Sequence, residues 1–126
     1  MFGFTSAGSG KRCWFLDDVS IRDVTAPTVE ILQNPTFNAS STSLPGWIQY
    51  CTSNCPSGSL NGGQVASGSN CSNNNCYTDH CYGTGFIDFL SQNFPTIIGR
   101  VYTLSFWLIL FGSGTTATST VYVDVY

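Results

Sequence analysis

Cysteine is the residue type in this chain whose number and spacing carry the plainest chemistry. The sequence contains six of them: Cys13, Cys51, Cys55, Cys71, Cys76 and Cys81. So many cysteines in a chain of 126 residues indicate an oxidising compartment in which they form disulfides. Six cysteines allow fifteen pairings, and local pairing of Cys51 with Cys55 and of Cys71 with Cys76 is the simplest guess. Cys13 and Cys81 would then remain to pair with each other.

A zinc site and a catalytic site are the alternatives to disulfides. The spacing of Cys51 and Cys55 is acceptable for zinc, and His80 is available, but the weakly charged, serine- and asparagine-rich chain favours disulfides. His80 is the only histidine, and Asp79 beside it would point to the opposite face of a strand. The chain also lacks the nucleophile-elbow, zinc-protease and phosphate-loop motifs. The sequence therefore predicts a protein that is not an enzyme.

Aromatic residues make up 14% of the chain, and exposed rings beside amides and carboxylates form a platform on which sugars bind. Tyr77, Asp79, His80 and Tyr82 follow one another closely enough to build such a platform. Ordinary tyrosines on the face of a sheet are the alternative. We expect six aromatic residues to be the more exposed ones: Trp14, Tyr50, Tyr77, Tyr82, Tyr122 and Tyr126.

Two tripeptides match the acceptor motif for N-linked glycans. They are Asn38-Ala39-Ser40 and Asn70-Cys71-Ser72, and both fall in stretches that we expect to be loops. Asn38 is the better candidate, because Asn70 shares its tripeptide with a cysteine that we expect in a disulfide.

Composition limits the kinds of partner and the compartment. Charged residues are only 9% of the chain, the net charge is −3, and the four basic residues are scattered, which argues against binding of nucleic acid. The longest apolar run, residues 104–111, is far shorter than the roughly 20 residues that cross a bilayer, so no membrane insertion is predicted. The first residues do not resemble an export signal. The cysteines nevertheless predict a secreted, extracellular protein, present here as a mature chain or as one unit of a longer polypeptide.

The elements that must position these residues are predicted to be strands. Apolar residues are 42% of the chain, enough for a core, and β-branched and aromatic residues are common while strong helix formers are scarce. Clusters of Gly, Pro, Asn and Ser separate eight candidate strands: residues 13–21, 29–33, 47–51, 64–67, 76–81, 86–94, 101–111 and 118–126. Such a series predicts an all-β, antiparallel jelly-roll sandwich that is stabilised by disulfides.

The order of several short motifs is similar to that of a known family. VEILQNPTFN followed by LPGW, within residues 29–47, resembles the opening of carbohydrate-binding modules with a galactose-binding-like jelly roll. FLDDVSI, residues 15–21, resembles the closing strand of the same modules, and the middle part GQV, CY, DFLSQNF and IGRVYTLSFWL also fits. The resemblance covers most of residues 13–126. It implies a jelly roll that binds sugars through aromatic residues and that, in many members, holds a structural calcium.

The resemblance implies a calcium ligand in the closing strand, at Asp17 with Asp18 beside it. Backbone carbonyls near Asn34 and Phe37 would supply some of the six to eight oxygens that calcium takes. Asn38 stands where the family usually has an acidic residue, which weakens the implied site. The alternative is that Asp17 lies at a bulge of its strand and accepts backbone N–H bonds. No other cofactor is expected.

One departure from the family bears on function, because the closing strand here comes first. Reading Tyr126 into Met1 restores the usual order, so the chain resembles a circular permutant or one unit of a head-to-tail array. Alternation places Phe15, Val19 and Ile21 on one face, and their burial would contribute roughly 1.5–3 kcal/mol each. We divide the chain into a strand segment, a linker and a jelly-roll body: residues 1–24, 25–28 and 29–126.

The strand segment can be donated to a neighbour, or it can fold back onto its own body. Donation by every copy makes a head-to-tail contact, which grows into an open filament unless a ring closes. The sequence therefore predicts an extracellular structural module that polymerises with copies of itself by donor-strand complementation. The alternative is a monomeric carbohydrate-binding module whose partners are glycans or a polysaccharide.

Overall fold

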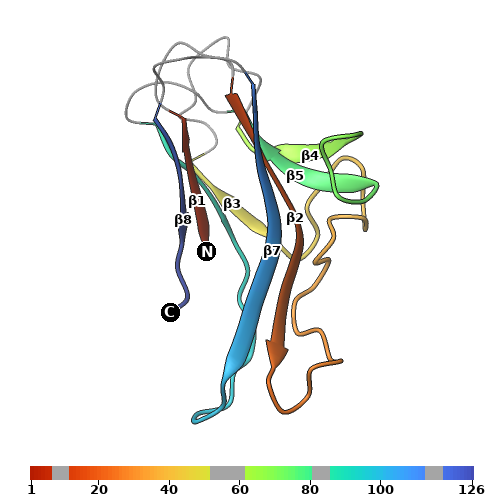
Figure 1. Ribbon diagram of the computed structural model, residues 1–126, viewed down its shortest axis with the longest axis vertical. Helices are drawn as coiled ribbons and strands as arrows, with labels where there is room; N and C mark the ends of the chain where they lie inside the picture. The colour runs from red at the N-terminus through yellow and green to blue at the C-terminus, as the bar shows by residue number, and fades with distance from the viewer. Residues whose placement is uncertain (7–11, 52–61, 81–85, 113–117) are drawn as a thin grey trace.

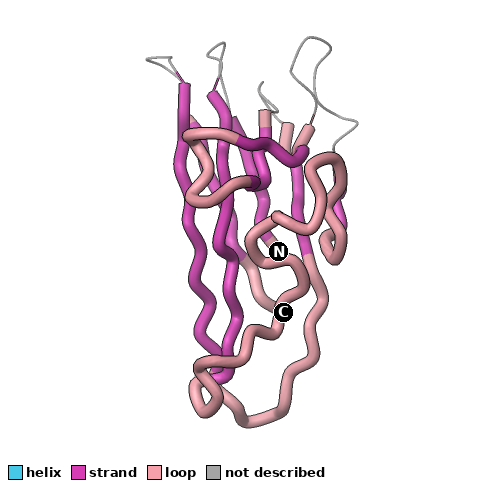
Figure 2. The backbone as a smooth tube through the Cα atoms, turned by 90° about the vertical axis from the view of Figure 1, so that its right-hand side faces the viewer, coloured by secondary structure: helices cyan, strands magenta, loops and turns pink. Residues whose placement is uncertain are grey.

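The structure is a computed structural model, and it describes residues 1–6, 12–51, 62–80, 86–112 and 118–126 (Figures 1 and 2). The strands are β1 (Phe2–Ser6), β2 (Arg12–Asp23), β3 (Ile48–Tyr50), β4 (Gln64–Ser67), β5 (Asn75–Asp79), β6 (Asp88–Ser91), β7 (Tyr102–Gly112) and β8 (Ser119–Val123). Within these ranges there is no helix that is long and apolar enough to cross a membrane.

The strands form two four-stranded antiparallel sheets, with the orders β3-β6-β1-β8 and β4-β5-β2-β7. The pairs β1–β8, β2–β7, β3–β6 and β4–β5 are those of one long antiparallel ribbon that is rolled over on itself. This is the pairing of a jelly roll, in which two sheets enclose one core. The predicted all-β sandwich of eight strands is confirmed.

Two strands differ from the prediction. The stretch 29–33 is not a strand, because the Glu30 carboxylate accepts the N–H groups of Ile31 and Leu32, which a sheet ladder would need. β1 was not predicted, since FGFTS is short and contains a glycine. A Cβ on Gly3 would lie 2.9 Å from Cε1 of Phe89, so the close approach of β6 explains the glycine.

The core lies between the sheets, and β1 and β2 supply about half of it. The rings of Phe4 and Tyr77 pack in a tilted arrangement with centroids 5.3 Å apart, and those of Phe37 and Trp47 do so at 5.2 Å, both within the favourable range for aromatic pairs. The buried core cluster contains Phe2, Phe4, Trp14, Leu16, Val19, Ile21, Leu32, Phe37, Trp47, Tyr77 and Leu90.

A bulge interrupts β2. The register of β2 against β7 shifts between Asp17 and Ser20, and Asp18 has a positive φ of 49°. The inserted residue shifts the alternation by one position, so even-numbered residues face the core before the bulge and odd-numbered residues face it afterwards. They are Trp14 and Leu16 before it and Val19 and Ile21 after it.

The bulge also corrects the predicted donor face. Val19 and Ile21 face the core, whereas the Phe15 ring packs edge-on against His80 and Phe111 on the opposite face of the sheet. Strict alternation failed here because it counts residues and does not allow for the inserted one. All three predicted donor residues are nevertheless buried.

The described parts of the strand segment, β1 and β2, lie within the sandwich of their own chain, which is the fold-back arrangement. β1 lies between β6 and β8, and β2 lies between β5 and β7. The predicted linker 25–28 belongs to a pair of turns, closed by hydrogen bonds from Ala26 N to Asp23 O (2.9 Å) and from Val29 N to Ala26 O (3.1 Å). Exchange of the segment between copies stays a prediction.

The two ends of the chain lie side by side (Figure 1). Met1 N donates to Asp124 O at 2.6 Å, and Asp124 N donates to Met1 O at 2.9 Å. This adjacency is the geometry that reading Tyr126 into Met1 requires.

Candidate functional site

The strand segment and the groove that holds it form the candidate site. Residues 14–16 of β2 pair with residues 77–79 of β5, and on the other side β2 pairs along its length with β7. In the other sheet, β1 pairs with β6 and with β8. Without residues 1–23, each sheet would have a gap one strand wide, lined on both sides by unpaired main-chain groups.

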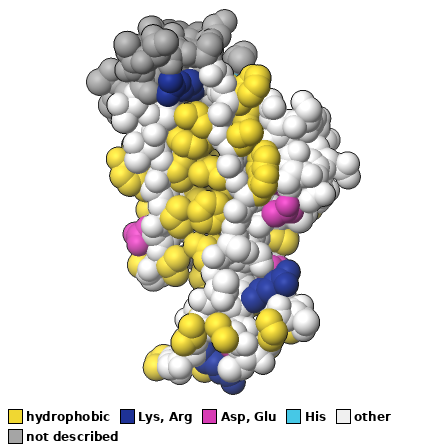
Figure 3. All heavy atoms as spheres, in the orientation of Figure 1, with side chains coloured by type: hydrophobic (Ala, Val, Ile, Leu, Met, Phe, Trp, Pro, Cys, Tyr) yellow, Lys and Arg dark blue, Asp and Glu magenta, His cyan; other side chains and the backbone are white. Residues whose placement is uncertain are grey.

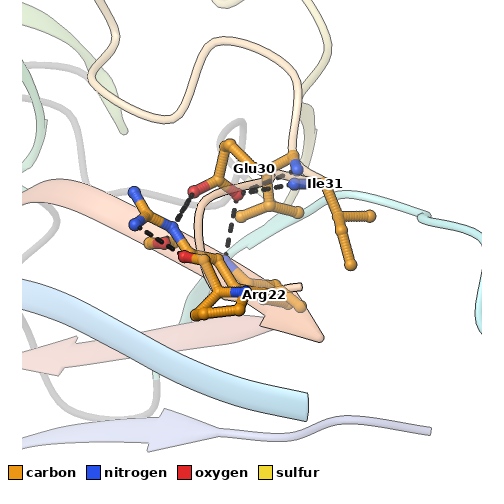
Figure 4. Close-up of polar contacts among 7 residues, drawn as sticks. Arg22, Glu30 and Ile31 are labelled. Atoms are coloured by element: carbon orange, nitrogen blue, oxygen red, sulfur yellow. Dashed lines mark hydrogen bonds and ion pairs between the residues drawn. The ribbon is translucent and has the colours of Figure 1, made fainter. Parts of the chain in front are cut away.

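A carboxylate clamps the end of β2 to the segment that follows it (Figure 4). Oε2 of Glu30 accepts from Ser20 Oγ at 2.6 Å and lies 3.5 Å from Nε of Arg22. Oε1 accepts the backbone N–H groups of Ile21, Ile31 and Leu32 at 3.0–3.1 Å. Glu30 is the sole glutamate of the chain, and the sequence pattern offers no signal for this role.

Hydrogen bonding decides the charge of this clamp. Burial alone would raise the pKa of Glu30, but the hydrogen bonds from Ser20 and from the backbone of Leu32 and Ile21 outweigh it and hold the pKa below its ordinary value. The ionised carboxylate is therefore the form that joins the strand segment to the jelly-roll body.

Asp17 and Asp18 meet the turn that precedes β5. Asp17 is fully buried; its Oδ1 accepts from Asp18 N at 2.8 Å, and its Oδ2 accepts from Ser72 Oγ and Asn73 N, both at 3.1 Å. The Asp18 carboxylate accepts from Asn73 Nδ2 at 3.0 Å and from the Ser72 hydroxyl. The structure thus matches the alternative in which Asp17 lies at a bulge and accepts backbone N–H bonds.

These groups do not fit a calcium site as they are arranged. Three N–H donors, on Asp18, Asn73 and the Asn73 side chain, point at the two carboxylates where a cation needs oxygens. The side-chain oxygen of Asn38 accepts from Asn75 N at 3.0 Å. No cluster of three His, Cys, Asp or Glu residues suited to a metal occurs in the described part of the chain. The calcium site stays a prediction.

The cysteines follow the prediction in part. Cys71 and Cys76 form the predicted local disulfide. Cys51, which is exposed, and Cys13, which is half-buried, have free thiols in the structure, so the expectation of disulfides at these two positions is wrong. The predicted partners Cys55 and Cys81 lie outside the described residues.

The Cys13 thiol instead lies against a histidine. Sγ of Cys13 is 2.8 Å from Nδ1 of His80. Burial, and after it the charge of Asp79, raise the pKa of the Cys13 thiol, and burial lowers the pKa of His80. Both shifts favour the neutral forms, and a protonated thiol is a weak nucleophile. The geometry therefore describes a structural hydrogen bond between β2 and the residue that follows β5.

The predicted sugar platform is not at the surface. Tyr77 is fully buried, because its face of β5 meets Phe4 of the other sheet across the core, and Asp79, two residues further along β5, is buried as well. Burial, followed by the charges of Asp79 and Asp88, raises the pKa of Tyr77 well above its ordinary value. A Cβ on Gly63 would lie 1.8 Å from the Tyr77 hydroxyl, which explains the glycine.

The expectation that Tyr77 and Asp79 are exposed is therefore wrong, and so is that for Trp14, which is buried. Tyr82 lies outside the described residues. The predicted exposure is confirmed for three tyrosines: Tyr50, Tyr122 and Tyr126.

The two glycosylation candidates differ in access. Asn38 is exposed, although its side-chain oxygen is engaged by the backbone of Asn75. Asn70 is half-buried and adjoins the disulfide at Cys71. Glycans at Asn38 and Asn70 stay predictions, with Asn38 the more accessible of the two.

One side of the sandwich exposes apolar side chains. The two sheets end there in β7 and β8, and Figure 3 shows apolar side chains gathered along the face between these strands. Charged residues and prolines usually protect an edge strand from pairing with another chain. β7 contains neither over residues 102–112. The large exposed side chains are Phe106, Ile109, Leu110, Phe111, Tyr122 and Val123.

Comparison with family models, with curated proteins and with solved structures finds no match to this chain.

Proposed function

We propose that the chain is a non-catalytic, extracellular structural module that joins copies of itself by exchanging residues 1–23. One observation carries the proposal: these residues supply an inner strand to each sheet, and every strand beside them belongs to residues 29–126. A body without its own β1 and β2 offers two grooves that another copy's segment fits with the same register and the same contacts.

Exchange costs little free energy when the fold-back and exchanged arrangements differ only in the connector. The contacts of β1 and β2 are equivalent in a fold-back monomer and in an exchanged assembly, so their large burial energy does not distinguish the two. The two arrangements differ in the turn at residues 24–28, and most of this turn is exposed. Pro27 biases Ala26 in the turn towards an extended conformation. Opening this turn breaks the two backbone hydrogen bonds that close it and the exposed bonds from Thr25 to Asp23 and from Arg22 to Pro27 O, all of which water can replace.

The surroundings of the grooves support assembly. The uncharged edge of β7 and the exposed apolar residues of β8 favour contacts between copies, because they leave apolar surface in water. The disulfide Cys71–Cys76 is compatible with secretion, and an extracellular location with glycans at Asn38 belongs to this proposal.

Cross-strand cysteines test the exchange. Ser20 of β2 lies opposite Ser105 of β7, so a chain with Ser20→Cys and a second chain with Ser105→Cys are refolded together, both with Cys13 and Cys51 changed to Ser. Exchange predicts a covalent dimer on a non-reducing gel, because the two new thiols then come from different chains. The matched control pairs Ser20→Cys with Ser119→Cys, which belongs to the other sheet. Equal yields from the control and the test pair, or no dimer from either, would refute the exchange.

A further inference from the structure

The outer edge of β7 is the longest open sheet edge among the described strands. β7 is the last strand of its sheet and has eleven residues, whereas the other three edge strands, β3, β4 and β8, have three to five. A short edge strand offers another chain little to pair with. β7 pairs with β2 on one side only, so the main-chain groups along its other side have no partner strand within the described ranges.

Apolar side chains of the core reach this edge without being covered (Figure 3). Phe106 of β7 packs edge-on against Phe2 of β1, with ring centroids 5.2 Å apart, and thereby joins the two sheets at their open side. Alternation along β7 puts Leu110 on the same inner face. Phe106 and Leu110 are nevertheless 38% and 36% exposed, and Val123 of β8 is 41% exposed. The open side therefore presents apolar side chains from both sheets.

A second copy of the chain fits this surface better than a single extended peptide does. A peptide strand can pair with β7, but it adds one layer and leaves the β8 side uncovered. A second sandwich brings its own β7 and its own β8, so both layers continue across the contact.

The size of the edge is also sufficient for a dimer. Eleven residues span about 37 Å, and two sheets ~10 Å apart with their side chains are about 20 Å wide, so each copy would bury on the order of 700 Å². A standard protein–protein interface buries about 800 Å² per partner.

We propose that two copies pair antiparallel through the outer edges of β7, about a two-fold axis perpendicular to the sheet. The register that pairs all eleven residues puts Trp107 opposite its own copy on the axis. Ser105 then lies opposite Ile109 of the second copy, and Leu104 opposite Leu110, so the inner-face residues of both copies stay on one face. The contact is isologous and closes at two copies.

This contact goes beyond the proposed exchange of residues 1–23 and does not depend on it. β7 lies outside the exchanged segment, and its outer edge is open whether its own β2 or the β2 of another copy occupies the inner side. In an exchanged assembly the contact would join two filaments side by side.

A pair of cysteines tests the contact and its register together. Ser105→Cys and Ile109→Cys are introduced into one chain in which Cys13 and Cys51 are changed to Ser. Four residues of strand separate the two new thiols by about 13 Å, so they cannot bond to each other within one chain, whereas each faces its counterpart in the second copy. Mild oxidation should give a covalent dimer on a non-reducing gel.

The matched control is Thr103→Cys with Ile109→Cys in the same background. It has the same number of thiols on the same face of β7, but Thr103 lies opposite Phe111 of the second copy and not opposite Ile109. No dimer from the Ser105 and Ile109 pair, or an equal yield from the control pair, would overturn the inference.

A lysine at the edge gives a second measurement that needs no new thiols. Chains are refolded at high dilution, where folding back outcompetes exchange between copies, and are then concentrated for sedimentation velocity. Ile109→Lys should dimerise only at an about tenfold or higher concentration than the unchanged chain, because a lysine blocks edge pairing. Ile48→Lys is the control, since Ile48 is similarly exposed and lies on the edge strand β3.

An unchanged chain that stays monomeric after dilute refolding, an Ile109→Lys chain that dimerises as readily as the unchanged one, or an equal loss in Ile48→Lys would overturn the edge contact. These outcomes leave strand exchange to its own test, in which chains with Ser20→Cys and with Ser105→Cys are refolded together. Failure of that test would in turn leave the edge contact standing.

Discussion

At the scale of single residues, two carboxylates, Asp17 in β2 and Glu30 after it, hold loops onto β2 on either side of its bulge. Asp17 accepts from Ser72 and Asn73, and Glu30 accepts from Ser20 and the backbone around it. Hydrogen bonds to a charged acceptor are stronger than neutral ones, and both carboxylates are shielded enough for the difference to count. Three predictions belong to this scale.

The first concerns Glu30. Its pKa is lower in the folded chain than its ordinary 4.5, so its contribution is fully present above that value and is lost as the pH falls through the folded pKa. Glu30→Gln should lower stability by about 1–3 kcal/mol near neutral pH and should flatten the loss of stability in acid. Thermal unfolding between pH 3 and 7 measures both effects. Asp124→Asn is the control, and an acid profile of Glu30→Gln parallel to the unchanged chain would contradict the clamp.

The second concerns the thiols. Cys51 is exposed, whereas Cys13 is half-buried and has a raised thiol pKa, so of these two described thiols Cys51 should react quickly with iodoacetamide at neutral pH and Cys13 slowly. Mass spectrometry of peptides from the native, alkylated chain reports each position. Rapid labelling of Cys13 without denaturant would show that the contact with His80 does not protect it.

The third concerns calcium. Because protein donors already satisfy the Asp17 carboxylate, we expect the melting temperature to be the same in millimolar calcium and in a chelator. Differential scanning calorimetry of the two samples makes the comparison, with magnesium as the control ion. A rise of several degrees with calcium alone would restore the metal site that the family resemblance implies.

At the scale of elements, β2 is the strand on which the sandwich depends. It pairs with β5 and β7 and buries side chains on both of its faces. The bulge lets Asp17 and Asp18 meet the turn before β5 without removing Val19 and Ile21 from the core.

The loss of stability caused by a substitution in β2 should therefore depend strongly on whether the new side chain is charged or apolar. Val19→Asp should prevent folding and assembly, because an unpaired charge in the core costs several kcal/mol. Ile21→Val keeps the shape and the main-chain pairing and should cost only about 0.5–1.5 kcal/mol. Chemical denaturation gives both values. A Val19→Asp chain with near-normal stability would place that side chain outside the core.

At the scale of the whole molecule, the proposed strand exchange uses main-chain pairing and buried apolar side chains, and it needs no covalent bond between chains. The described disulfide joins two residues of one chain. Native mass spectrometry should therefore find the same assembled mass before and after mild reduction. A fall to the mass of the single chain, 13.6 kDa, would instead indicate that exposed Cys51 or another thiol links the copies.

The sequence by itself determined the fold class and most strand positions. Alternating β-branched and aromatic residues between Gly, Pro, Asn and Ser clusters leave few structures other than a sandwich, and pairing of Cys71 with Cys76 follows from their proximity. These features are local, so a local pattern is enough to find them.

Only the tertiary structure decided which side chains are exposed and which strands are inner. Tyr77 carries the same local pattern as an exposed tyrosine, and its burial follows from the packing of its side of β5 against Phe4 of the other sheet. The bulge at Asp18 places Phe15 and Val19 on opposite faces of β2. The Glu30 carboxylate accepts hydrogen bonds from β2, which ends seven residues before it in the sequence. The pairing and packing of strands that are distant in sequence set these properties, and the residue pattern within one strand does not indicate which strands lie beside it.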